Sequence, residues 1–166
     1  RIFLAFAKAD KLEHVVQKAT ELGAAEVIAF PSKRCVSTPD AGALTKKLAR
    51  WNKIAASAAA QSGRGRIPTV TAAASFDAAL AQAAQAELPV LFYENEQHRT
   101  FREAIGDATF ASAALMTGPE GGFIPEEIQA AQQAGLQICT LGPRILRCET
   151  APLCALSALL YATGEF

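Results

Sequence analysis

The sequence contains little of what several protein classes require. Its 166 residues include only four cysteines, at spacings that match no zinc-binding or redox pair, so neither a disulfide framework nor a metal site is indicated. Three of these cysteines lie in apolar surroundings, which indicates reduced thiols and a cytoplasmic location. The longest apolar run, residues 151–162, is interrupted by Ser157 and is shorter than the roughly 20 residues that span a bilayer. We therefore expect a buried helix and no membrane contact.

An excess of charge of one sign is also missing, because the formal net charge is zero, which by itself disfavours a nucleic-acid partner. The distribution is uneven, however: residues 33–66 carry eight basic side chains and the single acid Asp40, a net charge of +7. A solvated helix face is the usual explanation of a charge run. Because no acid interrupts the basic helical stripe, and a positive field attracts phosphate, we favour a nucleic-acid-binding surface made of Lys46, Arg50, Lys53, Arg64 and Arg66.

The hydrophobic periodicity predicts a single α/β domain over residues 1–166. Short apolar segments indicate buried strands at 2–7, 26–30, 69–72, 90–93, 113–116 and 136–141. The segments between and after them predict helices at 10–22, 43–61, 76–86, 101–105, 125–135 and 150–163. This alternation is typical of a mostly parallel sheet flanked by helices. Asp10, with Glu13 three residues later, predicts a side-chain cap for the first helix.

Two loops carry most of the chemical information. Residues 141–151, Leu-Gly-Pro-Arg-Ile-Leu-Arg-Cys-Glu-Thr-Ala, place two arginines and a carboxylate between a strand and an apolar helix. Residues 117–123, Thr-Gly-Pro-Glu-Gly-Gly-Phe, likewise follow a strand and open a helix. This second loop does not have the glycine pattern of a dinucleotide fingerprint or a P-loop, and its glycines leave backbone groups open to a flat base or an amino-acid moiety. Strand ends gather around ligands in such folds, so the two loops predict one pocket.

Arg144 and Arg147 could be ordinary surface residues that pair with Glu149. The surroundings favour a different interpretation, because the apolar residues beside them should be buried: Leu141, Ile145 and Leu146. We therefore expect Arg147 to lie partly desolvated beside the pocket. Cys148 could be a nucleophile, but no histidine lies near it in the sequence, which favours a packing role.

Three segments together resemble the ribosomal small subunit methyltransferase E family of the SPOUT superfamily: residues 60–64 before Pro68, residues 118–122, and residues 141–151. The match runs in order across nearly the whole chain. The resemblance implies an α/β fold with a deep C-terminal trefoil knot, a homodimer, and methyl transfer from S-adenosylmethionine to N3 of a uridine in 16S ribosomal RNA. It also implies an N-terminal β-barrel RNA-binding domain. This chain enters its first strand directly, without initiator methionine or leader, so we expect a fragment that lacks that domain.

Two positions depart from the family pattern, which usually has glutamate at Ala60 and threonine at Cys148, so no required role is assigned to those missing side chains. The resemblance implies that the cofactor is held by three loops, through Phe92, Tyr93, Glu94, Thr117, Gly118, Pro119, Glu120, Gly121, Gly122, Leu141, Gly142, Ile145 and Leu146.

Uracil methylation at N3 requires loss of a weakly acidic proton and stabilisation of the negative charge that spreads onto O2 and O4. Arginine suits that task. We therefore expect Arg147, with Arg64 and Gln61 from a second turn, to stabilise the uracil anion. Glu149 would orient an arginine or accept the proton, and Glu120 would bind rather than catalyse.

Three other functions remain open from the sequence. The chain could be a knotted module that binds the cofactor or RNA without turnover when truncated. It could be a SPOUT methyltransferase acting on transfer RNA or another ribosomal position, which the motif order disfavours. It could also be an enzyme that uses Cys148 as nucleophile, which the missing histidine disfavours.

Overall fold

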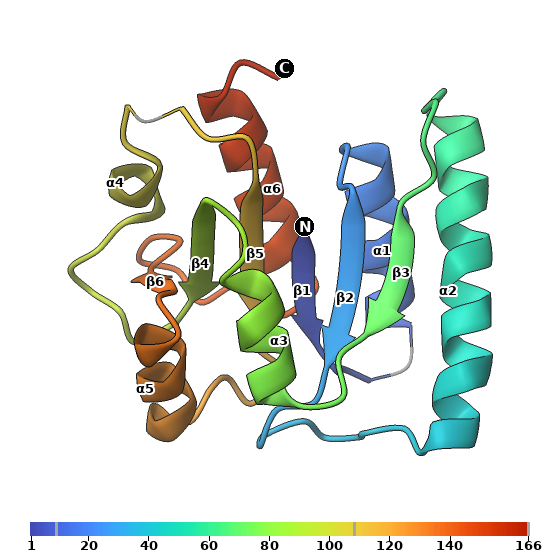
Figure 1. Cartoon of the computed structure of the whole chain (residues 1–166), viewed down its shortest axis with the longest axis horizontal. Helices are drawn as coiled ribbons and strands as arrows, with labels where there is room; N and C mark the ends of the chain where they lie inside the picture. The colour runs from blue at the N-terminus through green and yellow to red at the C-terminus, as the bar shows by residue number, and fades with distance from the viewer. Residues whose placement is uncertain (9, 108, 166) are drawn as a thin grey trace.

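The computed structural model describes residues 1–8, 10–107 and 109–165. Six strands form one sheet in the order β3-β2-β1-β5-β4-β6, and every neighbouring pair is parallel (Figure 1). The expected mostly parallel α/β sheet is thus confirmed. The strands are β1 (Ile2–Ala5), β2 (Glu26–Phe30), β3 (Thr69–Ala72), β4 (Leu88–Phe92), β5 (Ala113–Thr117) and β6 (Gln137–Cys139).

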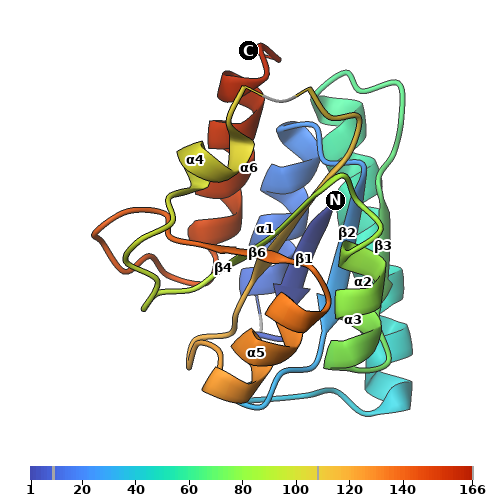
Figure 2. The same ribbon diagram turned by 60° about the vertical axis from the view of Figure 1, so that its left-hand side comes forward.

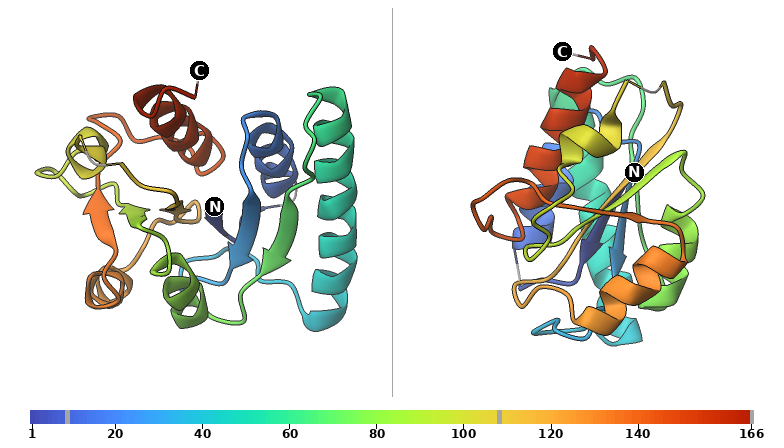
Figure 3. Two further views of the ribbon diagram at one scale, coloured as in Figure 1. Left: turned by 45° about the horizontal axis from the view of Figure 1, so that its top comes forward. Right: turned by 90° about the vertical axis from the view of Figure 1, so that its left-hand side faces the viewer.

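Helices cover both faces of this sheet. One face is covered by α1, α2, α4 and α6, and the other by α3 and α5 (Figure 3). All twelve predicted elements are present, with ends that differ from the expected ones by up to three residues. The helices are α1 (Lys11–Glu21), α2 (Ala41–Gln61), α3 (Phe76–Ala83), α4 (Phe101–Ile105), α5 (Pro125–Gln133) and α6 (Ala151–Ala162).

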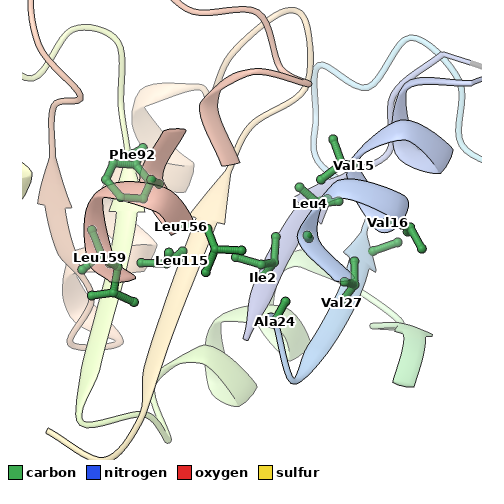
Figure 4. Close-up of a cluster of buried hydrophobic side chains, with 14 of the residues drawn as sticks. Ile2, Leu4, Val15, Val16, Ala24, Val27, Phe92, Leu115, Leu156 and Leu159 are labelled. Atoms are coloured by element: carbon green, nitrogen blue, oxygen red, sulfur yellow. The ribbon is translucent and has the colours of Figure 1, made fainter. Parts of the chain in front are cut away.

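The terminal helix α6 is part of the hydrophobic core, as its composition predicted. Its residue Leu156 lies between Leu115 of β5 and Ile2 of β1 (Figure 4). All three side chains are at most 5% exposed, and burial of such side chains stabilises the fold by about 1.5–3 kcal/mol each. Within the described residues, no helix combines the length and the apolar character needed to cross a bilayer.

The predicted cap of α1 is wrong. Asp10 has helical backbone angles and its side chain makes no capping hydrogen bond. The carboxylate of Glu13, expected to complete the cap, instead accepts a hydrogen bond of 2.7 Å from Arg50 on α2. Side-chain caps occur elsewhere, as where Asp40 accepts from the backbone N–H of Ala43 at 2.7 Å and begins α2.

The sheet topology determines where a site can form. Because all strands are parallel, their carboxyl ends share one edge, and the loops after β4, β5 and β6 meet there. The order of the strands reverses between β1 and β5, which makes this edge the usual place for a ligand in an open α/β sheet. The loop between β6 and α6 projects from the body of the molecule at this edge (Figure 2).

Candidate functional site

A cleft of about 860 Å³ lies at the carboxyl ends of β4, β5 and β6. Three segments line it: residues 92–100, the glycine loop (residues 117–122) and the arginine loop (residues 141–150). Every residue expected to hold the cofactor lines this cleft except Gly121. The single pocket predicted from the two loops is therefore present, and a third segment, after β4, completes it.

Close packing explains two of the glycines in the glycine loop. A Cβ atom on Gly118 would lie 3.1 Å from the ring of Phe123, which is tighter than ordinary van der Waals contact. Gly122 has a φ of +68°, which favours glycine, and a Cβ atom there would push aside the carboxylate end of the exposed Glu94 side chain. Glycine at these positions lets the loop lie against both neighbours and leaves its backbone facing the cleft.

A residue outside the predicted site fixes the outer side of the glycine loop. Nη1 of Arg34, from the segment after β2, donates a hydrogen bond of 3.0 Å to the carbonyl oxygen of Gly121. A Cβ atom on Gly121 would approach Cβ of Arg34 to 2.9 Å. Gly121 therefore contacts Arg34 and does not line the cleft. Its expected contact with the cofactor stays a prediction, and this position does not favour it.

The arginine loop is more open than expected. Ile145 was predicted to be buried but is 84% exposed, because the loop projects past the edge of the sheet (Figure 2). Leu141 and Leu146 are half-buried. Arg144 and Arg147 both line the cleft, and among the described residues neither forms an ion pair. A surface pair with Glu149 is thus not formed. Arg147 lies beside the pocket as expected, but the expectation that it is partly desolvated is wrong, because the residue is exposed.

Glu149 instead belongs to a cluster centred on Lys11, a residue that the sequence pattern did not assign to the site. Nζ of Lys11 lies 3.3 Å from Oε2 of Glu149 and 3.2 Å from Oε1 of Glu120. The backbone N–H of Lys8 also donates to Glu120, at 3.1 Å. One signal could have revealed Lys11: the helix that it begins follows β1, so its first turn lies at the edge where the other loops meet.

The charged forms of this cluster are favoured. Burial lowers the pKa of Lys11, but its bonds with Glu120 and Glu149 outweigh burial and raise that pKa above its ordinary value. Burial raises the pKa of Glu120, yet the backbone N–H groups of Glu120 and Lys8, followed by Lys11, bring it below its ordinary value. The pKa of Glu149 is lowered, first by its own backbone N–H and then by Cys148 and Lys11. A carboxylate of this kind is a weak base.

Cys148 is a poor nucleophile in these surroundings. Burial, followed by its hydrogen bond to Glu149, raises the pKa of the thiol to about 11. The Sγ atom donates to Oε2 of Glu149 at 3.2 Å. Because the thiolate is the reactive form, Cys148 remains a protonated packing residue near neutral pH.

Arg64 lies at the opposite edge of the sheet from the cleft. Its guanidinium donates to the carbonyl oxygens of Thr20, Gly23 and Ala24 at 2.9, 3.2 and 2.7 Å, which ties the turn after α2 to the segment before β2. Within one chain, therefore, neither Arg64 nor the exposed Gln61 beside it reaches Arg147. The expected contact of Arg64 and Gln61 with uracil therefore requires a site that is shared between two copies of the chain. For such a site it stays a prediction.

The basic residues on α2 form an exposed face: Lys46, Arg50 and Lys53, with Arg66 in the turn that follows. Arg50 pairs with Glu13, whereas Lys46, Lys53 and Arg66 form no ion pair among the residues that the structure describes. The helix lies beside β3, at the end of the sheet farthest from β6 (Figure 1). In the part of the chain that the structure describes, no group of three or more His, Cys, Asp or Glu side chains could hold a metal ion.

Known proteins of similar sequence are RNA methyltransferases. A family profile described as RNA methyltransferase domain matches residues 1–160. Ribosomal RNA small subunit methyltransferase E of Bacillus subtilis is 40% identical over 161 residues, covering 94% of this chain and 63% of that protein. The protein of the same name from Mycobacterium tuberculosis is 37% identical over 165 residues, covering 98% and 63%. This chain thus spans less than two thirds of these relatives.

Solved structures give the same picture. Ribosomal RNA small subunit methyltransferase E from Neisseria gonorrhoeae, bound to S-adenosyl methionine, is 33% identical with a TM-score of 0.81, covering 97% of this chain and 65% of that one. A methyltransferase from Legionella pneumophila, in complex with the bound cofactor SAM, is 34% identical with a TM-score of 0.88, covering 98% and 66%.

Proposed function

The chain belongs to the RNA methyltransferase domain family, and from that premise we propose that it transfers a methyl group from S-adenosylmethionine to N3 of a uridine in 16S ribosomal RNA. The observation that carries the proposal is the cleft, which is lined by the glycine loop and by Arg147, an arginine without an ion pair among the described residues. Relatives named for small-subunit ribosomal RNA methylation, and a neighbour of that name bound to S-adenosyl methionine, support it. The proposed substrate would place the protein in the cytoplasm.

The residues present fit S-adenosylmethionine. The cleft volume of about 860 Å³ lies within the range of small-molecule sites. Its walls offer backbone groups at Gly118 and Gly122 and aliphatic side chains at Leu141 and Leu146, as an adenine ring requires. The bound cofactor would supply the methyl group on a positively charged sulfur.

Arg147 has the properties needed to stabilise the uracil anion. Its guanidinium lines the cleft and is not engaged by a carboxylate among the described residues. A planar fork of N–H donors can contact O2 or O4 as negative charge develops there. Glu149 suits neither of its expected roles, because it pairs with Lys11 instead of an arginine and its pKa is lowered. We assign Glu149 to holding the arginine loop.

Methyl transfer to small ribosomal subunits that lack the modification tests the proposal. Incubation with labelled S-adenosylmethionine should place the label in 16S RNA, and nucleoside analysis should identify N3-methyluridine. Calorimetric titration of the cofactor separates binding from turnover. Binding without transfer would leave a cofactor-binding module, and label on transfer RNA or at another atom would replace the proposed substrate.

We further propose that the protein is a homodimer joined through the outer face of α6. This helix carries no charged side chain along its length. Cys154, Ala158 and Tyr161 lie exposed on it, with Tyr161 80% exposed. An exposed apolar stripe of this kind is typical of an interface. Sedimentation equilibrium should give a dimer, and Ala158→Arg should give a monomer with the same circular dichroism spectrum.

We also propose that the C-terminal segment forms the trefoil knot expected from the sequence. The course of the chain supports this proposal: β6 pairs with β4 at the end of the sheet, and α6 then returns to pack on β5, β1 and α1. The arginine loop makes that return, so threading would hold it against the cleft.

A further inference from the structure

Three segments far apart in the sequence meet at one ammonium group. Nζ of Lys11 lies within ion-pair distance of Glu120, from the glycine loop, and of Glu149, from the arginine loop. It also lies 3.6 Å from Sγ of Cys148. The side chains of Lys11, Glu120 and Glu149 are 26%, 23% and 30% exposed, so solvent screens the three charges only partly.

The cluster lies behind the cleft. Glu120 and Cys148 belong to the cleft wall, whereas Lys11 contacts that wall from α1 and is not among the residues that line it. Lys11 is itself fixed in place, since it begins a helix whose next residue, Leu12, is 3% exposed in the core. The helix therefore provides a rigid support to which both loops are attached.

We propose that Lys11 is a positioning residue that joins the glycine loop to the arginine loop and thereby sets the width of the cofactor cleft. The inference rests on the proposed function and names a determinant of its binding step. Without the ammonium, two carboxylates would face each other, and like charges repel where solvent screens them only partly. The two loops would separate, and the cleft would no longer have the spacing that lets both walls contact one ligand.

Calorimetric titration of S-adenosylmethionine into variants of this chain tests the inference. Lys11→Met keeps the length of the side chain and removes the charge, and we expect its Kd to rise about tenfold or more. Lys11→Met combined with Glu149→Gln removes the repulsion but does not restore the link between the loops, so its Kd should fall between those of Lys11→Met and wild type. Rescue at a distant position distinguishes positioning from a role in the stability of α1.

Two further variants serve as controls. Lys18→Met removes another ammonium of α1, which among the described residues pairs with Glu21 alone, at 2.9 Å, and it should bind as wild type does. Lys11→Arg keeps the cation and should also bind within about threefold. An unchanged Kd for Lys11→Met would overturn this inference but not the proposed function. So would a Lys11→Met chain that fails to fold and that Glu149→Gln does not restore. Failure of the wild-type chain to bind would overturn the proposed function and this inference with it.

Discussion

Arg147 is the cationic residue whose surroundings best match a role in the reaction. It lines the cleft and has no carboxylate partner among the described residues, whereas Glu149, two positions later, is engaged by Lys11. We expect Arg147→Ala to lower kcat by about 10²- to 10³-fold, as the removal of a donor to a developing anion does, with the Kd for S-adenosylmethionine changed less than threefold. Single-turnover assays and calorimetry separate the two effects. A pure affinity defect would contradict this assignment.

At Gly122 the need for glycine has two separable causes. Its φ of +68° disfavours any side chain, and a Cβ atom would in addition collide with Glu94, which lines the cleft. Gly135 has a φ of +91° with open space around it and so isolates the first cause. Both alanine variants should lower the free energy of unfolding by about 1 kcal/mol. Only Gly122→Ala should weaken S-adenosylmethionine binding, by about tenfold; equal affinities would show that Glu94 adapts without cost.

At the scale of the element, the caps of α2 and α1 form a matched pair. Asp40 accepts a hydrogen bond from Ala43, whereas Asp10 caps nothing. Asp40→Ala should therefore lower the free energy of unfolding by about 1 kcal/mol, and Asp10→Ala should change it by less than about 0.5 kcal/mol. Urea denaturation measures both. A comparable effect of Asp10→Ala would restore the cap that Asp10 and Glu13 predicted.

Elements could be predicted more fully than contacts between them. The β3 strand and the α4 helix have the bounds that periodicity and turn residues predict, because those signals are local. The pocket followed from two strand-ending loops and the parallel topology. The Lys11 cluster was missed because Lys11 lies more than 100 residues before Glu120 and Glu149, and only the position of α1 directly after β1 connects it to their edge of the sheet. For a related reason the sequence left open whether Arg64 acts in its own chain or from a second copy: nearness to a motif in sequence does not say at which edge of the sheet a turn lies.

At the scale of the whole molecule, the basic face of α2 and the cleft lie in different places. Helix α2 lies beside β3, whereas β5, β4 and β6 form the other half of the same sheet (Figure 1). The basic face belongs to α2, and the cleft lies at the carboxyl ends of β4, β5 and β6. A ribosomal RNA bound by this chain would have to contact both regions of one copy, or the basic face of one copy and the cleft of another. In either arrangement the residues of α2 that would bind phosphate are separate from the residues that line the cleft, so each set can be changed without changing the other.

Salt dependence measures phosphate binding by α2 directly. The affinity of Lys46→Gln/Lys53→Gln for a 16S RNA fragment should fall, and the slope of log K against log salt concentration should shrink by about 1 for each phosphate that the variant no longer neutralises. Arg102→Gln removes an exposed cation from α4, far from α2, and should leave the slope unchanged. The Kd for S-adenosylmethionine should stay the same in both variants, because neither change touches the cleft. Equal slopes in all three proteins would exclude the α2 face from RNA binding and leave its positive charge as a solvated helix surface.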